Sequence, residues 1–181
     1  MNKKQSYATL LLILVTQVMV SQAKVASNGS MDSPNILFVF SDDHAWQSIG
    51  AYGGRLKEVA HTPNIDKLAS EGMLFRKCFV ANALCGPSRA AVLTGKYGHR
   101  NGVTWNRNTN FDGSQQTFPK MMRQNGYQTA IIGKWHLASV PTGFDYFDVM
   151  KGQGRYYNPF LQRGNAEGLK DTRTVVGYNS D

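Results

Sequence analysis

The chain has 181 residues, of which 41% are hydrophobic and 18% charged, and its 20 basic and 12 acidic side chains give a formal net charge of +8. This length suffices for one ordinary domain with its own core, and the apolar content excludes a fully disordered chain. The positive charges are scattered, without a basic stripe or a known nucleic-acid-reader motif, so we expect an anionic small substrate or glycan rather than nucleic acid.

The first residues have the pattern of a secretory signal peptide. Two lysines precede an apolar run from Ala8 to Val20, and residues 21–23 supply the small side chains of a cleavage site. The run is shorter than the ~20 residues that span a bilayer, so no stable membrane span is expected, with an uncleaved anchor as the alternative. We expect residues 1–23 to be a signal peptide, residues 24–33 a flexible lead-in, and the protein to be secreted, periplasmic or in a lysosome-like compartment.

The first predicted element of the fold is a strand over residues 35–40. This run is continuously apolar and contains β-branched and aromatic side chains, which is typical of a parallel strand covered on both faces. A helix follows, with Thr62 as its N-cap, Pro63 in its first turn and Gly72 as its stop. Residues 73–80 are the second strand candidate.

The next segments continue this alternation of helix and strand. Residues 87–94 are expected to be helical and to end at a glycine, and residues 96–116 to form a long polar loop. Another helix is expected to begin at Thr117-Phe118-Pro119 and to end at Gly126, followed by a strand over residues 127–132. Past Gly143 we expect irregular loops.

This order of elements predicts an α/β fold with a mainly parallel sheet flanked by helices. In such folds, sites form beyond the carboxyl ends of the strands. Asp42-Asp43 follows the first predicted strand, Cys85 follows the second, and residues 134–136 follow the third. We therefore expect three polar clusters, far apart in the sequence, to meet at one edge of the sheet.

The first two clusters have residue types suited to a metal and a nucleophile. Asp42 and Asp43 offer oxygen ligands for a hard cation such as Ca²⁺ or Mg²⁺, although they could instead lie in a solvated loop. Cys85, just before a predicted helix, would have increased thiolate character, and Arg89 would lie one turn further on. The alternatives for Cys85 are a buried structural thiol or a disulfide with Cys78.

The third cluster contains Lys134 and His136, which alternate along a strand end. A lysine and a histidine that face an anion could hold it and transfer a proton. A hydrogen-bonded structural histidine is the alternative. These residues alone predict an anion-handling metal site with a cysteine, without naming the anion.

Four segments of the chain resemble motifs of the type I sulfatases, and they occur in the same order along the sequence. The segment Cys85-Gly86-Pro87-Ser88-Arg89, continuing to Leu93-Thr94-Gly95-Lys96, resembles their Cys-x-Pro-Ser-Arg signature and the Leu-Thr-Gly turn that follows it. Residues 34–43, 62–66 and 133–137 are similar to the family's first strand and metal motif, its Thr-Pro-Asn-Leu-Asp helix and its Gly-Lys-Trp-His-Leu motif. The resemblance implies an alkaline-phosphatase-like fold, of which residues 34–181 would be the N-terminal portion of the catalytic domain.

The resemblance also implies a modified nucleophile. In this family a maturation enzyme oxidises the signature cysteine to Cα-formylglycine, so a disulfide from Cys85 to Cys78 is not expected. The hydrated aldehyde attacks the sulfur of a sulfate ester and later expels sulfate. Asp42, Asp43 and the modified Cys85 would bind the metal, which is Ca²⁺ or, as the alternative, Mg²⁺.

Further roles carry over to matching positions. Arg89 would stabilise the hydrated aldehyde, Lys134 would contact the sulfate, and His136 would take a proton from the diol. Lys96 matches a basic residue that steadies the aldehyde, and we expect it to bind substrate together with Lys134.

Members of this family usually have several hundred residues, and their later metal ligands have no counterpart in these 181 residues. We therefore expect this chain alone to have little or no sulfatase activity. Residues 111–117, 141–145 and 152–159 resemble the glucosamine-6-sulfatases, which implies a sulfated glycan substrate carrying a 6-O-sulfate on N-acetylglucosamine. The alternatives are a phosphate or phosphonate ester hydrolase of the same superfamily and an inactive glycan-binding fragment.

Overall fold

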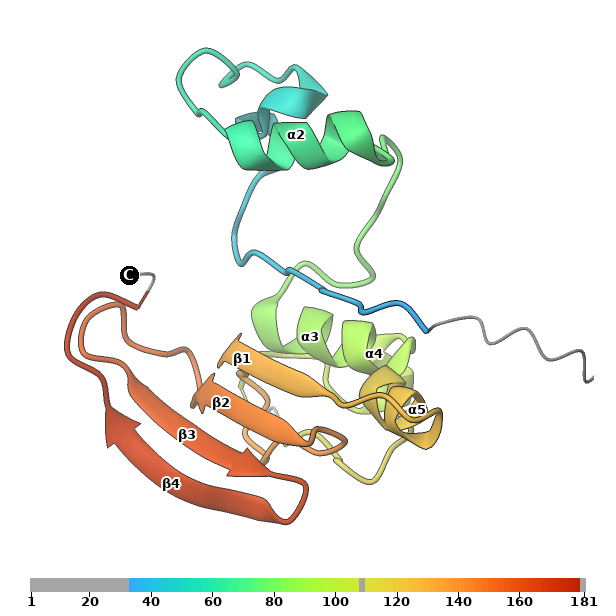
Figure 1. The fold of residues 1–181 in the computed structure, drawn as a ribbon, viewed down its shortest axis with the longest axis vertical. Coiled ribbons are helices and arrows are strands. Elements are labelled where there is room, and N and C mark those ends of the chain that lie inside the picture. The colour runs from blue at the N-terminus through green and yellow to red at the C-terminus, as the bar shows by residue number, and fades with distance from the viewer. Residues whose placement is uncertain (1–32, 108–109, 180–181) are drawn as a thin grey trace, which may run out of the picture. The chain divides into compact units, whose positions relative to one another are not determined.

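The computed structural model describes residues 33–107 and 110–179 (Figure 1). The predicted signal peptide and nearly all of the predicted lead-in lie outside these residues. The chain divides into two units, one that ends at Ser41 and one that begins at Asp42. Within the described ranges, the helices are all too short or too polar to cross a bilayer.

The described part of the first unit is extended, but the predicted strand over residues 35–40 is wrong. No strand is assigned there, and the side chains of Leu37 and Val39 are 89% and 79% exposed. An apolar run becomes a strand only when a neighbouring strand supplies backbone partners. The sheet formed by the described residues is built from other segments.

The predicted helix after Thr62 is confirmed. Helix α2 (Pro63–Glu71) begins directly after Thr62, with the proline in its first turn, and ends at Gly72. Two short 3₁₀ helices precede it, η1 (Trp46–Ser48) and η2 (Gly50–Tyr52). The strand predicted over residues 73–80 is wrong, because this segment is irregular and its apolar side chains lie in solvent, including Phe79, which is 89% exposed.

Helix α3 (Cys85–Thr94) confirms the predicted helix but begins two residues earlier. Proline is tolerated in the first helical turn, where a backbone N–H has no helical partner, so Pro87 does not delay the start. The first helical hydrogen bond therefore runs from the N–H of Ser88 to the carbonyl of Leu84, at 2.8 Å. Gly95 ends the helix in the left-handed conformation, with a φ of 66°.

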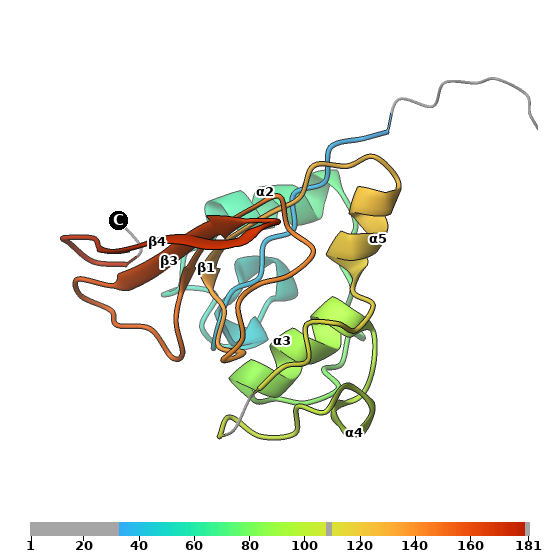
Figure 2. The ribbon, with the colours of Figure 1, turned by 90° about the horizontal axis from the view of Figure 1, so that it is seen from below.

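Two shorter helices follow. Helix α4 (Gly98–Asn101) interrupts the segment predicted to be a loop, and helix α5 (Phe118–Gln124) begins after Thr117 as predicted. Helix α3 packs against both of them. Figures 1 and 2 show this group of helices beside strand β1 (Ala130–Lys134).

The sheet is mixed, so the prediction of a mainly parallel sheet is wrong. Its four strands lie in the order β1-β2-β3-β4, with β2 at Tyr146–Met150, β3 at Phe160–Asn165 and β4 at Gly168–Thr174. Strand β1 pairs with β2 in parallel, whereas β2–β3 and β3–β4 are antiparallel. These last three strands occupy the region in which irregular loops were expected.

The core lies between the helices and the first two strands, and Trp135 is at its centre. The indole makes edge-to-face contacts with Phe111 and Phe144, at centroid distances of 6.5 and 6.3 Å. Phe147 and Val149, on β2, are fully buried in the same cluster. Because Trp135 directly follows β1, this packing fixes the chain on both sides of it, including Lys134 and His136.

Candidate active site

Cys85 is the first residue of α3. The helix has ten residues, and the partial positive charge at its N-terminus favours a negative charge at this position. The next backbone N–H, that of Gly86, donates a hydrogen bond of 2.9 Å to Oδ1 of Asn106. The loop after α4 therefore fixes the start of the helix, and with it the position of the Cys85 side chain.

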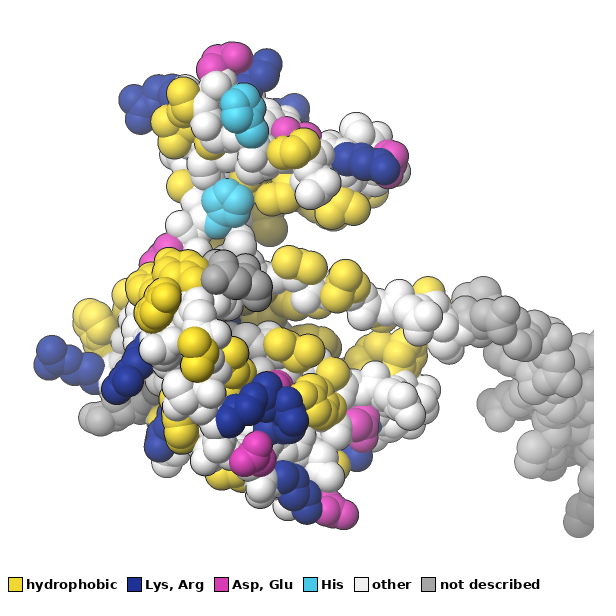
Figure 3. All heavy atoms as spheres, turned by 60° about the vertical axis from the view of Figure 1, so that its left-hand side comes forward, with side chains coloured by type: hydrophobic (Ala, Val, Ile, Leu, Met, Phe, Trp, Pro, Cys, Tyr) yellow, Lys and Arg dark blue, Asp and Glu magenta, His cyan; other side chains and the backbone are white. Residues whose placement is uncertain are grey.

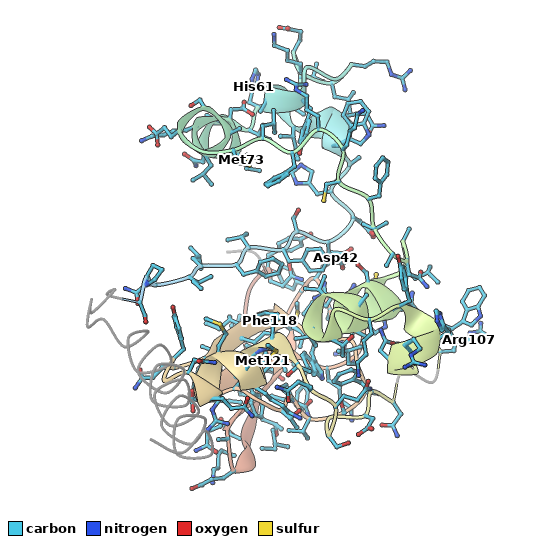
Figure 4. All side chains as sticks on the ribbon, turned by 90° about the vertical axis from the view of Figure 1, so that its right-hand side faces the viewer. Asp42, His61, Met73, Arg107, Phe118 and Met121 are labelled. Carbon is cyan, nitrogen blue, oxygen red and sulfur yellow. The ribbon has the colours of Figure 1, made fainter. Side chains whose placement is uncertain are left out.

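Two charged side chains meet the sulfur of Cys85. Oδ1 of Asp42 lies 3.5 Å from Sγ, and Nζ of Lys134 lies 3.6 Å from it. The Lys134 ammonium group also donates a hydrogen bond to Oδ2 of Asp42. Figure 4 labels Asp42 near α3. The predicted convergence of the three polar clusters is thus present, although two of the strands expected to carry them are not formed.

Arg89 joins α3 to the end of β1. Its Nη1 donates a hydrogen bond of 2.6 Å to the backbone carbonyl of Lys134, and its Nη2 lies 3.6 Å from Oδ1 of Asp42. The side chains of Arg89 and Lys134 are only 12% and 11% exposed. Two nearly buried cations therefore lie beside the partly exposed carboxylate of Asp42, where they are able to contact an anionic ligand.

Asp43 completes a group that could hold a metal ion. One ligand atom from each of Asp42, Asp43 and Cys85 lies within 4.8 Å of the others. Asp43 has a φ of 51°, a left-handed conformation that is uncommon outside glycine and frequent at functional sites. Two carboxylates are the donors that Ca²⁺ and Mg²⁺ prefer, so these residues fit a hard cation.

The pKa of Asp42 is lowered by its neighbours. Burial alone would raise it, but the hydrogen bond from Lys134 and the positive charges of Lys134 and Arg89 outweigh that effect. The hydrogen bond from Cys85 contributes in the same direction. Asp42 therefore stays ionised at neutral pH, as a metal ligand must be.

His136 is buried, with 9% of its surface exposed, and lies just beyond β1. Burial lowers its pKa below the usual 6.5, and the charges of Lys134 and Arg89 lower it further, against an opposing effect of Asp42. The imidazole is therefore neutral at pH 7. Its Nδ1 is buried and, among the described atoms, has no hydrogen-bond partner.

Lys96, which the sequence predicts to lie at the site, forms its side-chain hydrogen bond elsewhere. Its ammonium group lies 3.5 Å from Oε1 of Gln115. The alternative of a disulfide between Cys78 and Cys85 is also not observed, because both cysteines are free and Cys78 is exposed.

Sequence reasoning missed two residues that support the site. Asn106, which accepts the hydrogen bond from Gly86, lies in a polar loop in which nothing distinguished it from its neighbours. Trp135 is predicted only as one residue of the Gly-Lys-Trp-His-Leu motif, yet its indole N–H donates a 2.6 Å hydrogen bond to the carbonyl of Ser139 and closes the tight turn that contains His136. Its burial in the core could have been expected from its size and its place after an apolar strand.

Known proteins resemble this chain over most of the residues that the structure describes. The model of the Sulfatase family matches residues 34–181. An N-acetylglucosamine-6-O-sulfatase of Bacteroides thetaiotaomicron is 49% identical over 159 residues, which cover 86% of this chain and 28% of that protein. The human N-acetylgalactosamine-6-sulfatase is 39% identical over 129 residues, covering 65% of this chain and 24% of its own length.

A solved structure is similar to this chain in fold as well as in sequence. It shows a protein in complex with its substrate D-glucosamine-2-N,6-O-disulfate, and it matches 80% of this chain with a TM-score of 0.72 and 48% identity. The match covers 28% of that protein. This chain therefore spans roughly a quarter of the length of the relatives that it matches.

Proposed function

Because this chain belongs to the sulfatase family, we propose that it carries the nucleophile-bearing part of a hydrolase that removes sulfate from sulfated glycans. The fold matches part of the family's alkaline-phosphatase-like fold. The observation that carries the proposal is the set of groups around Cys85. A carboxylate and an ammonium group approach its sulfur within 3.6 Å, at the start of a helix.

The proposed nucleophile is Cys85 after oxidation to Cα-formylglycine by a maturation enzyme. The hydrated aldehyde would supply the hydroxyl that attacks sulfur, and a divalent cation, preferably Ca²⁺, would polarise the sulfuryl oxygens when bound by Asp42 and Asp43. Arg89 lies one helical turn from Cys85 and is held by the carbonyl of Lys134. It is thus positioned to stabilise negative charge on the diol.

Lys134 and His136 have separate roles in this proposal. Lys134, with its ammonium group beside Cys85 Sγ, binds a sulfate oxygen of the substrate. His136 is neutral because burial and neighbouring cations lower its pKa, so it is able to accept a proton from the second hydroxyl of the diol. Release of sulfate would then regenerate the aldehyde.

The proposed substrate carries a 6-O-sulfate on a glucosamine residue. Support comes from the Bacteroides relative, named an N-acetylglucosamine-6-O-sulfatase, and from the matching structure with D-glucosamine-2-N,6-O-disulfate. The site's own support is its two nearly buried cations, Arg89 and Lys134, which could pair with a sulfate group, while a metal ion held by Asp42 and Asp43 would add positive charge.

A binding experiment tests the anion site directly. Calorimetric titration of the purified chain with N-acetylglucosamine-6-sulfate is expected to show binding that Lys134→Ala weakens about tenfold or more, since a charge-assisted hydrogen bond is lost. Lys67→Ala is the control, because Lys67 is an exposed lysine paired with Glu71 on α2. Equal affinity in the two variants, both folded by circular dichroism, would contradict the role of Lys134.

Turnover is expected to be low for this chain by itself. Ca²⁺ takes about six to eight oxygen ligands, whereas the described residues bring together Asp42, Asp43 and Cys85. We therefore expect little or no hydrolysis of 4-nitrophenyl sulfate by the matured 181-residue chain. In an active form of the protein, the rates of hydrolysis of 4-nitrophenyl sulfate and 4-nitrophenyl phosphate would be compared. A large preference for the phosphate ester would indicate a phosphatase.

A further inference from the structure

The loop over residues 151–159 leaves the sheet beside the candidate active site. It follows Met150, the last residue of β2, which is paired in register with Lys134 at the end of β1. The backbone N–H of Trp135 also donates a 3.3 Å hydrogen bond to the carbonyl of Met150. The loop thus starts at the sheet edge that carries Lys134.

This loop is fixed by the segment that follows β4. The N–H of Asn158 donates to the carbonyl of Gly177 at 2.8 Å, and that of Asn179 donates to the carbonyl of Tyr156 at 2.8 Å. Tyr157 and Tyr178 form an isolated β-bridge, and the two segments run side by side in Figures 1 and 2. A surface fixed in this way loses little conformational freedom on binding.

Three tyrosines on these segments face solvent. Tyr156 is 71% exposed, Tyr157 is 66% exposed and Tyr178 is 44% exposed. The rings of Tyr156 and Tyr178 are stacked, with centroids 6.0 Å apart and an interplanar angle of 14°. We call these three residues the tyrosine platform. A stacked pair of exposed rings on a fixed backbone is suited to contact with the apolar face of a ligand.

The charges beside the tyrosine platform indicate the kind of ligand. Lys151 and Arg155, on the same loop, are both exposed, and in the view that brings this side forward basic side chains lie among hydrophobic ones (Figure 3). Flat rings with hydroxyl groups suit the apolar face and the hydroxyls of a pyranose ring, and the cations suit its sulfate groups.

We propose that the tyrosine platform binds the sugar chain of a sulfated glycan, next to the glucosamine residue whose sulfate lies at Cys85. This rests on the proposed function, because the platform would hold residues of the same substrate. The platform adds affinity for oligosaccharides and none for a monosaccharide.

The test compares two ligands and two variants by calorimetric titration. The ligands are a heparin-derived tetrasaccharide and N-acetylglucosamine-6-sulfate. We expect the double variant Tyr156→Ala/Tyr157→Ala to bind the tetrasaccharide about tenfold more weakly and the monosaccharide unchanged. Phe79→Ala is the matched control, because Phe79 is an aromatic side chain that is 89% exposed elsewhere. Tyr156→Phe, which keeps the ring, is expected to retain most of the tetrasaccharide affinity.

Three outcomes would overturn the proposal. They are equal tetrasaccharide affinity in the double variant and in Phe79→Ala, an equal loss for both ligands, and no tetrasaccharide binding by the unaltered chain. Failure of the proposed function would appear differently, as monosaccharide binding that does not depend on Lys134. A tetrasaccharide stripped of sulfate is expected to retain dependence on the tyrosines but to bind more weakly, because Lys151 and Arg155 lose their partners.

Discussion

The guanidinium group of Arg89 donates a 2.6 Å hydrogen bond from Nη1 to the backbone carbonyl of Lys134. This bond links the helix that begins at Cys85 to the strand that ends at Lys134. A backbone carbonyl at the end of a strand needs a hydrogen-bond donor from outside the sheet. For Lys134 this donor is the nearly buried guanidinium group of Arg89. The distance between the nucleophile and the Lys134 ammonium group therefore depends on Arg89.

Removal of this side chain is expected to destabilise the fold as well as the site. Arg89→Ala should lower the free energy of unfolding by about 2 kcal/mol, because a buried hydrogen bond to a charged donor is lost. Urea denaturation measures this value. The control Arg107→Ala removes an exposed arginine that Figure 4 labels, and it should change stability by less than about 0.5 kcal/mol. Equal effects of the two substitutions would show that Arg89 does not join the elements.

The second prediction concerns the proton affinity of His136. Burial is the main cause of its lowered pKa, and the charge of Lys134 lowers the pKa further. Lys134→Met should therefore raise the pKa of His136 toward the ordinary value of 6.5. Titration of the imidazole resonances by NMR measures the change. Lys67→Met, on α2, should leave the titration of His136 as it is. An unchanged pKa in Lys134→Met would rule out electrostatic coupling between these residues.

The same shift gives a pH dependence of stability. The pKa of His136 is 6.5 in the unfolded chain and lower in the folded chain. At a pH between the folded-state pKa and 6.5, the unfolded chain therefore binds the proton more readily. The contribution of His136 to stability is therefore complete above pH 6.5 and is lost as the pH falls toward the folded-state pKa. His136→Gln should remove this part of the acid sensitivity in urea denaturation at a series of pH values.

Asp145 should contribute acid sensitivity at lower pH. The backbone hydrogen bond from Thr129 and the charge of Arg123, 2.9 Å away, hold its pKa below the ordinary 3.8. Its stabilising effect is thus present above about pH 3.8 and is lost as the pH falls through the depressed pKa. Asp145→Asn should flatten the stability profile below pH 4, measured by thermal melts. Glu58→Gln, at an exposed carboxylate, is the control and should keep the slope.

Gly164 is a position at which the fold requires the absence of a side chain. A Cβ there would clash with the carbonyl oxygen of Gly168 and with the ring of Phe147, whose Cε1 would lie 2.7 Å away. Gly164→Ala should therefore cost about 3 kcal/mol of stability. Phe147→Leu in the same chain should recover part of the loss, which a double-mutant cycle detects. Additive effects would show that the ring does not cause the clash.

The elements that the sequence predicted well are those fixed by local signals. Helices α2, α3 and α5 each have a proline in the first turn, and glycine follows α2 and α3 directly. Strands also depend on a neighbouring strand for their hydrogen bonds, and the pattern of one segment does not reveal that neighbour. The apolar runs over residues 35–40 and 73–80 thus remained outside the sheet, whereas β2 to β4 formed from segments without a strong pattern of their own.

The residue types of the candidate site predicted the contact between its polar clusters, although two of the strands expected to position them are not formed. Asp42, Cys85 and Lys134 meet as expected, because pairing of their charges and polar groups favours the contact even where a flanking strand is missing. Lys96 instead forms an exposed hydrogen bond with Gln115, which no pattern in the sequence predicts. Asn106 could not be predicted, because its role depends on a backbone N–H exposed only when α3 begins at Cys85.

Mass spectrometry of the peptide that contains Cys85 tests the central claim most directly. The chain would be produced together with a formylglycine-generating enzyme and then digested. Cys78 lies in the same chain, is exposed and belongs to no signature, so it serves as an internal control. We predict that the Cys85 peptide has the mass of the aldehyde and reacts with a hydrazide, while Cys78 remains a thiol. A Cys85 that stays a thiol, while a known sulfatase in the same cells is converted, would contradict the claim that this residue is the nucleophile of a sulfatase.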